Sequence, residues 1–278
     1  MDISIFESLL YAFMSAITEF MPVSSTAHEQ ILLRLFGLNS VHPMMQLFVH
    51  IGILVSLFFA CRVYLRHMSR EERLRKIPKR RRKRQPDPRI VMDASFLKTA
   101  CIPLLLGFAF YSSISGWENR LPLSAALLVL NGLILHIPIY FIGGNRDSQS
   151  LTRLDAIAFG AVSALGMIPG LSRIGIAASY GALRAADHSH VYKWCLNLSL
   201  PAVAVMTVFD VIFMIAAGFA GISFIYIIQC ILAAAMAFLG ATISIRFVRF
   251  IVERAGLNGF SYYCWGAALF AFILYLYT

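Results

Sequence analysis

Cysteine is scarce in this chain, and its five copies lie far apart in the sequence. Zinc sites and disulfide frameworks need cysteines at close, paired spacings, so the sequence predicts neither. Every cysteine falls in an apolar stretch, where a thiol acts as a small buried hydrophobic group. The five are Cys61, Cys101, Cys195, Cys230 and Cys264.

Acidic side chains are also few, with 14 Asp and Glu against 24 Lys and Arg and a net charge of +10. Half of the basic residues lie between Arg66 and Arg89. A basic run can bind nucleic acid, but this one lies between two apolar segments. We therefore interpret 66–90 as a cytoplasmic loop that attracts anionic lipid headgroups, and we expect no nucleic-acid partner.

Residues 1–14 carry Asp2 and Glu7 but no basic segment, so we expect no cleaved signal peptide. Hydrophobic residues make up 59% of the chain, and the mean hydropathy of +0.74 is far above that of a soluble domain. Several apolar runs are long enough to cross a bilayer. The composition predicts an all-α polytopic membrane protein with a single domain over residues 1–278.

Residues 18–29, which read TEFMPVSSTAHE, interrupt the first apolar run. Pro22 lacks an N–H and disfavours helix at the residue before it, so a helix over about 3–20 should end there. Ser24 or Ser25 can cap a second helix over about 26–38. Inside a membrane, such a break must be buried in protein or line a watery cavity. Free amides, hydroxyls and positive helix-dipole ends favour an anion, phosphate above all.

Three apolar spans follow this break, over about 45–64, 94–113 and 123–142. A second interrupted segment, about 154–185, contains the sequence GMIPGLSR at 166–173. Three more spans cover about 190–217, 222–248 and 260–277. The sequence thus predicts six transmembrane helices and two re-entrant helix-loop-helix segments.

The two halves, about 1–143 and 144–278, share one plan, which is typical of an internal repeat with its site at the midplane. When six spans are threaded, the basic loops fall on one side, and the other side keeps only Glu118, Arg120 and the turn at 218–221. Three spans separate the breaks, so we expect an inverted repeat. The first pair should enter from outside, the second from the cytoplasm, and their tips should meet near the middle.

Meeting tips would gather seven polar residues in one pocket: Glu19, Ser24, Ser25, Thr26, His28, Ser172 and Arg173. Arg173 offers a planar set of donors that matches phosphate oxygens. His28 suits general acid–base chemistry, and a serine hydroxyl beside it can act as a nucleophile. Glu19 can hold a divalent cation or act as a base.

The same residues have structural interpretations. Glu19 and Arg173 can form a buried ion pair that only locks the two halves together. Ser24 and Thr26 can serve only as helix caps. His28 can be a structural histidine with both ring nitrogens satisfied.

Further polar residues lie near the breaks or on the spans. We expect Glu29 to point away from the pocket, towards solvent or headgroups. His50 can either line the pocket or pack between helices. We expect mostly packing roles for the other three, which are Lys98, His136 and Asp210.

Three stretches of the chain resemble the undecaprenyl pyrophosphate phosphatase (bacitracin-resistance) family. Residues 15–28, SAITEFMPVSSTAH, resemble its motif E-G-x-T-E-F-x-P-V-S-S-T-G-H. Residues 169–177, PGLSRIGIA, resemble its second motif, P-G-x-S-R-S-G-x-T. Residues 50–54, HIGIL, resemble its H-x-G-T-x-L stretch, and the order of segments matches along essentially the whole chain.

The resemblance implies a membrane phosphatase that removes one phosphate from the C55 polyprenyl diphosphate. This hydrolysis regenerates the lipid carrier for wall glycans, with a divalent cation, Mg²⁺ or Ca²⁺, as cofactor. The catalytic set that it implies is Glu19, Ser25, His28 and Arg173, with Glu19 also as the metal ligand. The implied substrate-binding residues are Ser24, Thr26, Ser172 and His50.

The chain departs from the family pattern at several positions. Ser15 stands where the motif has its first Glu, so one carboxylate is missing. Ala27 stands where the motif has Gly, and its side chain crowds the turn. Ile174 and Ala177 replace a Ser and a Thr and so remove two hydroxyls. Cys264 stands where the family has an Arg.

Two function classes fit this sequence. One is hydrolysis of a polyprenyl diphosphate. The other is transport of polyprenyl phosphates without hydrolysis, because an inverted repeat is itself a transporter architecture. We expect a multi-pass protein of the plasma membrane, with its site open to the outer side. The expected partners are the lipid diphosphate and the bilayer, and a homodimer is left open.

Overall fold

A computed structural model describes residues 3–114, 120–140, 151–184, 187–219, 222–255 and 257–277. Across these ranges, all regular secondary structure is helical, which confirms the predicted all-α class. The predicted loop residue Glu118 and the division of the halves at 143–144 lie outside the described residues.

The first interrupted segment forms two helices, α1 (Ile5–Glu19) and α2 (Ser25–Leu35). Ser4 and Glu7 form a reciprocal capping box that starts α1. The helix ends before Pro22, as the ring of proline dictates. Both helices are slightly shorter than predicted, but the break lies where the sequence placed it.

The basic segment is more helical than predicted. Helix α3 (Pro43–Lys76) runs through the first part of it, followed by the short 3-10 helix η1 (Lys79–Arg81) and by α4 (Pro88–Gly107). Residues 66–76 contain no Pro or Gly, so nothing there breaks the helix before Pro78. Across the connection, Arg84 pairs with the buried Glu71 of α3. The loop proper is therefore residues 77–87, not 66–90.

The second half of the chain repeats the plan of the first, in which two short helices are followed by three longer ones. The remaining helices are η2 (Phe108–Phe110), α5 (Tyr111–Ile114), α6 (Leu121–His136), η4 (Ile137–Tyr140), α7 (Arg153–Leu165), α8 (Arg173–Leu183), α9 (His188–Ala217), α10 (Phe224–Ala255) and α11 (Phe260–Tyr277). The α7–α8 pair is the predicted second interrupted segment.

Five helices of the described chain, α3, α4, α9, α10 and α11, are long and apolar enough to cross a membrane. The sixth expected span is α6, which has 16 residues and a length of about 24 Å. The 3-10 turn η4 extends it directly. Together the helices form a polytopic membrane protein.

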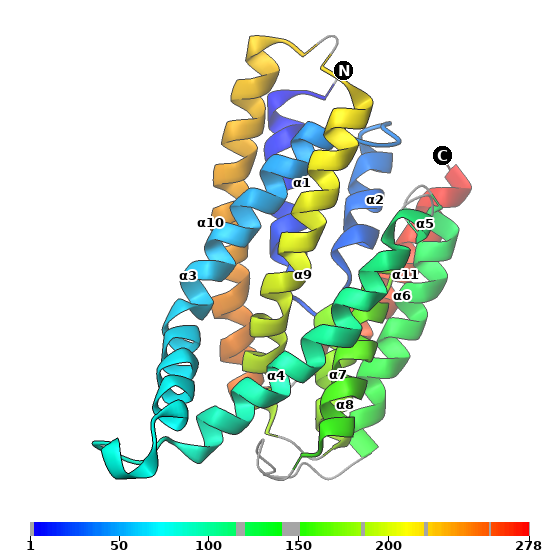
Figure 1. Ribbon diagram of the computed structural model, residues 1–278. Helices are drawn as coiled ribbons and strands as arrows, with labels where there is room; N and C mark the ends of the chain where they lie inside the picture. Colours follow the sequence, from blue (N-terminus) through cyan, green and yellow to red (C-terminus); the bar gives the residue numbers. More distant parts are fainter. Residues whose placement is uncertain are drawn as a thin grey trace.

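The two short hairpins enter the bundle from opposite ends (Figure 1). The α1–α2 pair enters from the end that carries both chain termini, and the α7–α8 pair enters from the end that carries the basic segment. Contacts alternate between the halves: α1 packs on α10, and α7 packs on α4. Helices α3 and α9 pack together, as do α6 and α11. This arrangement brings the two hairpin tips together in the interior.

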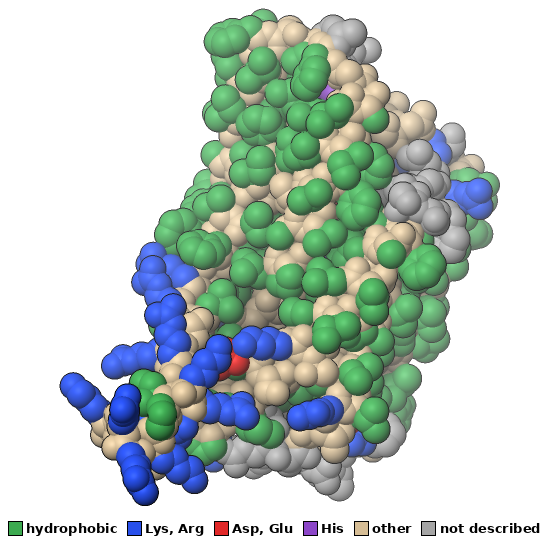
Figure 2. Space-filling model, viewed as in Figure 1, with side chains coloured by type: hydrophobic (Ala, Val, Ile, Leu, Met, Phe, Trp, Pro, Cys, Tyr) green, Lys and Arg blue, Asp and Glu red, His purple; other side chains and the backbone are tan. Residues whose placement is uncertain are grey.

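The outer surface matches a lipid environment. Hydrophobic side chains cover the flank of the bundle, whereas Lys and Arg gather at one end, around the connection of α3 and α4 (Figure 2). Exposed large hydrophobic residues are frequent on α10 and α11, including Ile228, Leu239, Leu269 and Phe272. Such a surface is stable in hydrocarbon and would aggregate in water.

Candidate active site

The tips of the two hairpins touch through hydrogen bonds that cross between the halves. The backbone N–H of Gly170 donates to the Ser24 hydroxyl (3.1 Å), and the Ser172 hydroxyl donates to the Met21 carbonyl (3.2 Å). Gly170 has φ +96°, and a Cβ there would lie 2.6 Å from the Ser124 carbonyl oxygen. The positive φ and the close packing of this tip against α6 therefore require glycine at this position.

Asn131 of α6 joins both tips, and the sequence analysis did not single it out. Its amide nitrogen donates to the Pro22 carbonyl (2.9 Å), and its amide oxygen accepts from the Ser172 N–H (2.9 Å). The side chain is fully buried. A lone Asn in an apolar span was the available signal, because a buried amide needs partners.

Ser24 has a different local role from the one predicted. It is the N-cap residue of α2, but its side chain makes no capping hydrogen bond and accepts from Gly170 instead. Its φ is +66°, in the region that favours glycine. A non-glycine residue held there costs about 1–3 kcal/mol, and such strain clusters at functional sites. The contact with the other hairpin supports this conformation.

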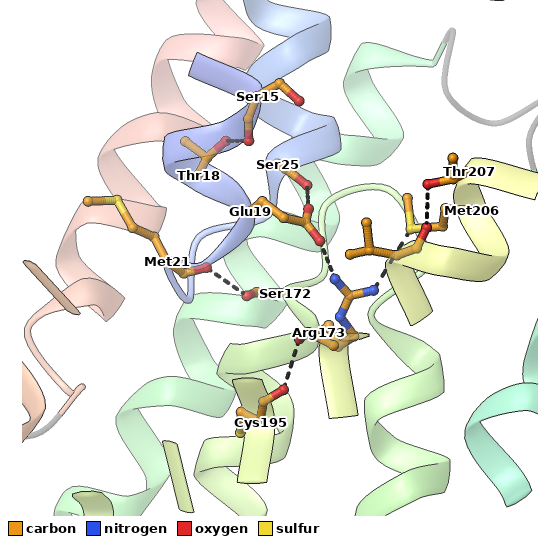
Figure 3. Close-up of polar contacts among 12 residues, drawn as sticks. Ser15, Thr18, Glu19, Met21, Ser25, Ser172, Arg173, Cys195, Met206 and Thr207 are labelled. Carbon is orange, nitrogen blue, oxygen red and sulfur yellow. Dashed lines mark hydrogen bonds and ion pairs between the residues drawn. The ribbon is translucent and has the colours of Figure 1, made fainter. Parts of the chain in front are cut away.

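Glu19, Ser25 and Arg173 converge at the meeting point from three helices (Figure 3). The Ser25 hydroxyl donates to one Glu19 carboxylate oxygen (2.6 Å), and the Arg173 guanidinium donates to the other. The side chains of Arg173 and Glu19 are 11% and 7% exposed, so both charges are largely removed from solvent. The two breaks therefore meet, as predicted, and bring these three residues together.

The cavity beside this cluster is small. It has a volume of about 30 Å³, close to the space of one water molecule in the liquid. Thr26 and Ser172 also line it. Arg173 Nε is buried and has no hydrogen-bond partner among the described residues. A phosphate oxygen can satisfy this donor, but a whole phosphate fits only if Glu19 moves away from Arg173.

Arg173 is the first residue of α8, and the backbone around it is held by a helix cap and by close packing. The Ser172 side chain caps the helix by accepting from the Gly175 N–H (3.1 Å). Gly166 at the end of α7 lies so close that a Cβ would fall 2.2 Å from the Arg173 Cα. The guanidinium and the positive end of the helix dipole thus point to one place, which favours an anion.

His28 is buried on α2 with both ring nitrogens engaged. Nδ1 donates to the Ser24 carbonyl (2.7 Å), since a carbonyl can only accept, and Nε2 faces the Tyr263 hydroxyl (2.9 Å). The His28 and Tyr263 rings are stacked with centroids 5.6 Å apart. His28 is not among the residues that line the Glu19–Arg173 cavity. The predicted acid–base role of His28 remains a hypothesis.

His50 of α3 lies in a separate buried pair. Its Nδ1 lies 2.5 Å from a carboxylate oxygen of Asp210 on α9. Neither residue lines the Glu19–Arg173 cavity. The structure thus places His50 at the packing of α3 on α9, and its substrate-binding role stays a prediction.

Glu29 does not face solvent or headgroups, and that expectation was wrong. It lies one helical turn after Ser25, on the side of α2 that faces α1. Its carboxylate accepts from the Ser15 hydroxyl and, at 3.4 Å, from the Tyr11 hydroxyl. The side chain is partly buried between the two helices.

The predicted divalent cation can be tested against these donors. The described residues contain no group of three or more His, Cys, Asp or Glu side chains that could hold a metal ion. Mg²⁺, however, often binds through one or two carboxylates together with substrate phosphates and water. Near Glu29, the buried Gln30 keeps an amide oxygen without a partner among the described residues. Carboxylates and an unused amide oxygen suit a hard cation.

Comparison with known proteins gives a consistent result. Residues 8–270 match the model of the family described as bacitracin resistance protein BacA. The chain is similar to the undecaprenyl-diphosphatase of Thermodesulfovibrio yellowstonii, with 28% identity over 98% of each chain. It is also similar to proteins of that name from Carboxydothermus hydrogenoformans (28% identity, 94% of this chain and 93% of the relative) and Methanobrevibacter smithii (26%, 97% of each).

Proposed function

Because this chain belongs to the bacitracin resistance protein BacA family, we propose that it hydrolyses undecaprenyl diphosphate to undecaprenyl phosphate and phosphate. Its relatives are named undecaprenyl-diphosphatase, which supports this reaction. The observation in the chain itself that carries the proposal is the convergence of Glu19, Ser25 and Arg173 at the tips of two hairpins. A hydroxyl, a proton acceptor and a phosphate-binding cation are the groups that the reaction needs.

The chemistry follows from these contacts. The terminal phosphate displaces Glu19 from Arg173, and its oxygens bind the guanidinium, including the free Nε. The Ser25 oxygen attacks the terminal phosphorus while its proton passes to Glu19. The bond from phosphorus to the bridging oxygen breaks and releases the polyprenyl phosphate. Water then cleaves the phosphoserine and releases phosphate.

Transport of polyprenyl phosphate without hydrolysis is the less favoured function. The relatives are named for hydrolysis. In addition, the hydroxyl of Ser25 lies 2.6 Å from a carboxylate, a contact that binding alone does not need. An anion-binding site for transport requires only the cation and neutral donors.

The membrane orientation belongs to this proposal. The excess of Lys and Arg supports a cytoplasmic position for the connection of α3 and α4. The α1–α2 hairpin lies at the opposite end of the bundle and would then enter from the outer side (Figure 1). The exchange of contacts between α1–α10 and α7–α4 supports an inverted repeat of halves 1–143 and 144–278. The site would open to the outer side of the plasma membrane.

Three further contacts are proposed for the same protein. The basic connection would bind anionic headgroups of the inner leaflet, with about 1 kcal/mol for each Lys or Arg near the surface. A homodimer stays a prediction, which a molar-mass measurement in detergent decides. A divalent cation, held by Glu19, would neutralise charge on the diphosphate when bound.

Phosphate release tests the reaction directly. Purified protein would be assayed with C55 and C15 diphosphates, with and without Mg²⁺ or Ca²⁺. Ser25→Ala should lower the rate by about 100-fold or more, because it removes the attacking oxygen. Ser69→Ala, at an exposed serine of α3, is the matched control and should keep the wild-type rate. Binding of both lipids without phosphate release by the wild type would support transport instead.

A further inference from the structure

Helices α1 and α2 run antiparallel, and two polar pairs cross between them. In the first pair, Ser25 of α2 donates to Glu19 of α1. In the second pair, one helical turn further from the tip, Ser15 of α1 donates to Glu29 of α2. Each pair joins one carboxylate to one serine. In the first pair the carboxylate lies on α1 and the serine on α2, whereas in the second pair the serine lies on α1 and the carboxylate on α2. Two carboxylates therefore lie on the facing sides of this hairpin, one turn apart.

The second pair accounts for the most conspicuous departure from the family motif. That motif has a Glu at the position of Ser15. Because Ser15 contacts Glu29 directly, the chain keeps a carboxylate at this level of the hairpin and supplies it from the opposite helix. Glu29 thus keeps a negative charge at this level of the hairpin, although position 15 has lost its carboxylate.

Glu29 lines a cavity of about 110 Å³ that adjoins the Glu19–Arg173 cavity, since Thr26 lines both. Gln30 also lines it and is only 8% exposed. The amide oxygen and nitrogen of Gln30 are both buried without a hydrogen-bond partner in the described part of the chain. Buried amides are normally paired, so this cavity is built for a ligand that both accepts and donates.

The charge of the cavity selects the ligand. Its lining includes Glu29 and neutral oxygen donors such as Asn39 and Gln46, but no Lys or Arg. A free anion is disfavoured there, and a hard cation with oxygen ligands is favoured. A hydrated cation together with a diphosphate would also satisfy both unpaired atoms of Gln30. The amide oxygen would bind the cation or accept from its water, and the amide nitrogen would donate to a phosphate oxygen.

We infer that Glu29, with the Gln30 amide, binds the divalent cation that accompanies the diphosphate, in place of a carboxylate at position 15. This inference rests on the proposed function, because the diphosphate would replace part of the water that completes the coordination of the cation in the free protein. It adds Glu29 to Glu19 as a ligand of the cation, and Glu19 still accepts the Ser25 proton.

The test measures Mn²⁺ binding to the purified full-length protein by the electron paramagnetic resonance signal of the free ion, with displacement by Mg²⁺. Glu29→Gln should weaken Mn²⁺ binding by about tenfold or more, because affinity follows the number of ligand charges. Ser15→Glu combined with Glu29→Gln returns the carboxylate to α1 and should restore binding to within about threefold of the wild type. Glu253→Gln, at an exposed Glu of α10, is the matched control and should bind as the wild type does.

Each outcome separates this inference from the proposed reaction, because phosphate release is measured on the same preparations. Unchanged Mn²⁺ affinity in Glu29→Gln, or no Mn²⁺ binding by the wild type at millimolar concentration, overturns the inference and means that the cavity holds water only. If the wild type binds Mn²⁺ through Glu29 but releases no phosphate, the inference stands and the reaction is wrong. If Glu29→Gln does not fold, the doubly substituted protein still decides, since recovery of folding without Mn²⁺ binding contradicts a ligand role.

Discussion

The two hairpins have nearly the same helix lengths but contribute different kinds of side chain to the site. Helices α1 and α2 have 15 and 11 residues, and α7 and α8 have 13 and 11. The first hairpin supplies carboxylates and hydroxyls, whereas the second supplies Arg173 and closely packed glycines. The proposed nucleophile, Ser25, lies in the first hairpin, and the cation that binds phosphate, Arg173, lies in the second. The comparison shows that the site exists only where the halves meet.

The hairpins also differ in how their second helices start. Ser172 caps α8 through its own side chain, so the α7–α8 hairpin satisfies its amides locally. Ser24 occupies the corresponding position before α2, but its hydroxyl accepts from Gly170 of the other hairpin. The strained conformation of Ser24 is thus supported from outside its own hairpin. The first hairpin depends on the second for its shape as well as for its cation.

The largest effect should come from removing the one feature that only the second hairpin has. We expect Arg173→Lys to lower phosphate release by about 100-fold or more, because an ammonium lacks the planar fork that binds two phosphate oxygens. Arg184→Lys, at the far end of the same helix, is the control and should have little effect. A near-normal rate for Arg173→Lys would show that this position needs only a positive charge.

A smaller effect should follow from a clash where the tip of the α7–α8 hairpin packs against α6. Gly170 and Gly37 both have positive φ, but only Gly170 has atoms within 4 Å of an added Cβ. Gly37→Ala should cost about 1–2 kcal/mol from backbone strain alone. Gly170→Ala adds the clash with Ser124, so its unfolding midpoint should fall further and Ser24 should lose its donor. Equal midpoints for the two variants would mean that the Gly170 tip is not tightly packed against α6.

The smallest effect is expected at the edge of the first hairpin. Tyr263→Phe removes the hydroxyl that faces His28 Nε2 and should cost about 0.5–1.5 kcal/mol of stability. Phosphate release should change by less than about threefold if His28 is held in place by structure alone. A much larger loss of rate, with normal thermal unfolding, would support the acid–base role predicted for His28.

Much of this architecture could be predicted from the sequence, because its signals are local. Apolar run length identifies the long helices, and Pro22 and Pro169 identify the breaks. The number of spans between the breaks then predicts the meeting of the tips. Helix α3 ran beyond its prediction, because a charged run without Pro or Gly continues a helix as well as an apolar one.

The contacts that could not be predicted depend on which faces meet in three dimensions. Sequence spacing placed Glu29 on a different face from His28, but it could not reveal that α1 covers that face. His50 lies against Asp210, 160 residues away, and no local pattern encodes such a pair. Asn131 needed the positions of both tips before its role as their clamp became visible.

The central claim is that the ion pair of Glu19 and Arg173 works on the substrate and does not merely lock the hairpins together. Phosphate release by the double variant Glu19→Gln/Arg173→Gln tests it most directly. If the pair were only a lock, removing both charges would leave no uncompensated buried charge, and the double variant would be more active than either single one. We predict that the double variant stays folded, with an unfolding midpoint at or above those of the single variants, and releases no phosphate above background. Recovery of activity in the double variant would contradict the account.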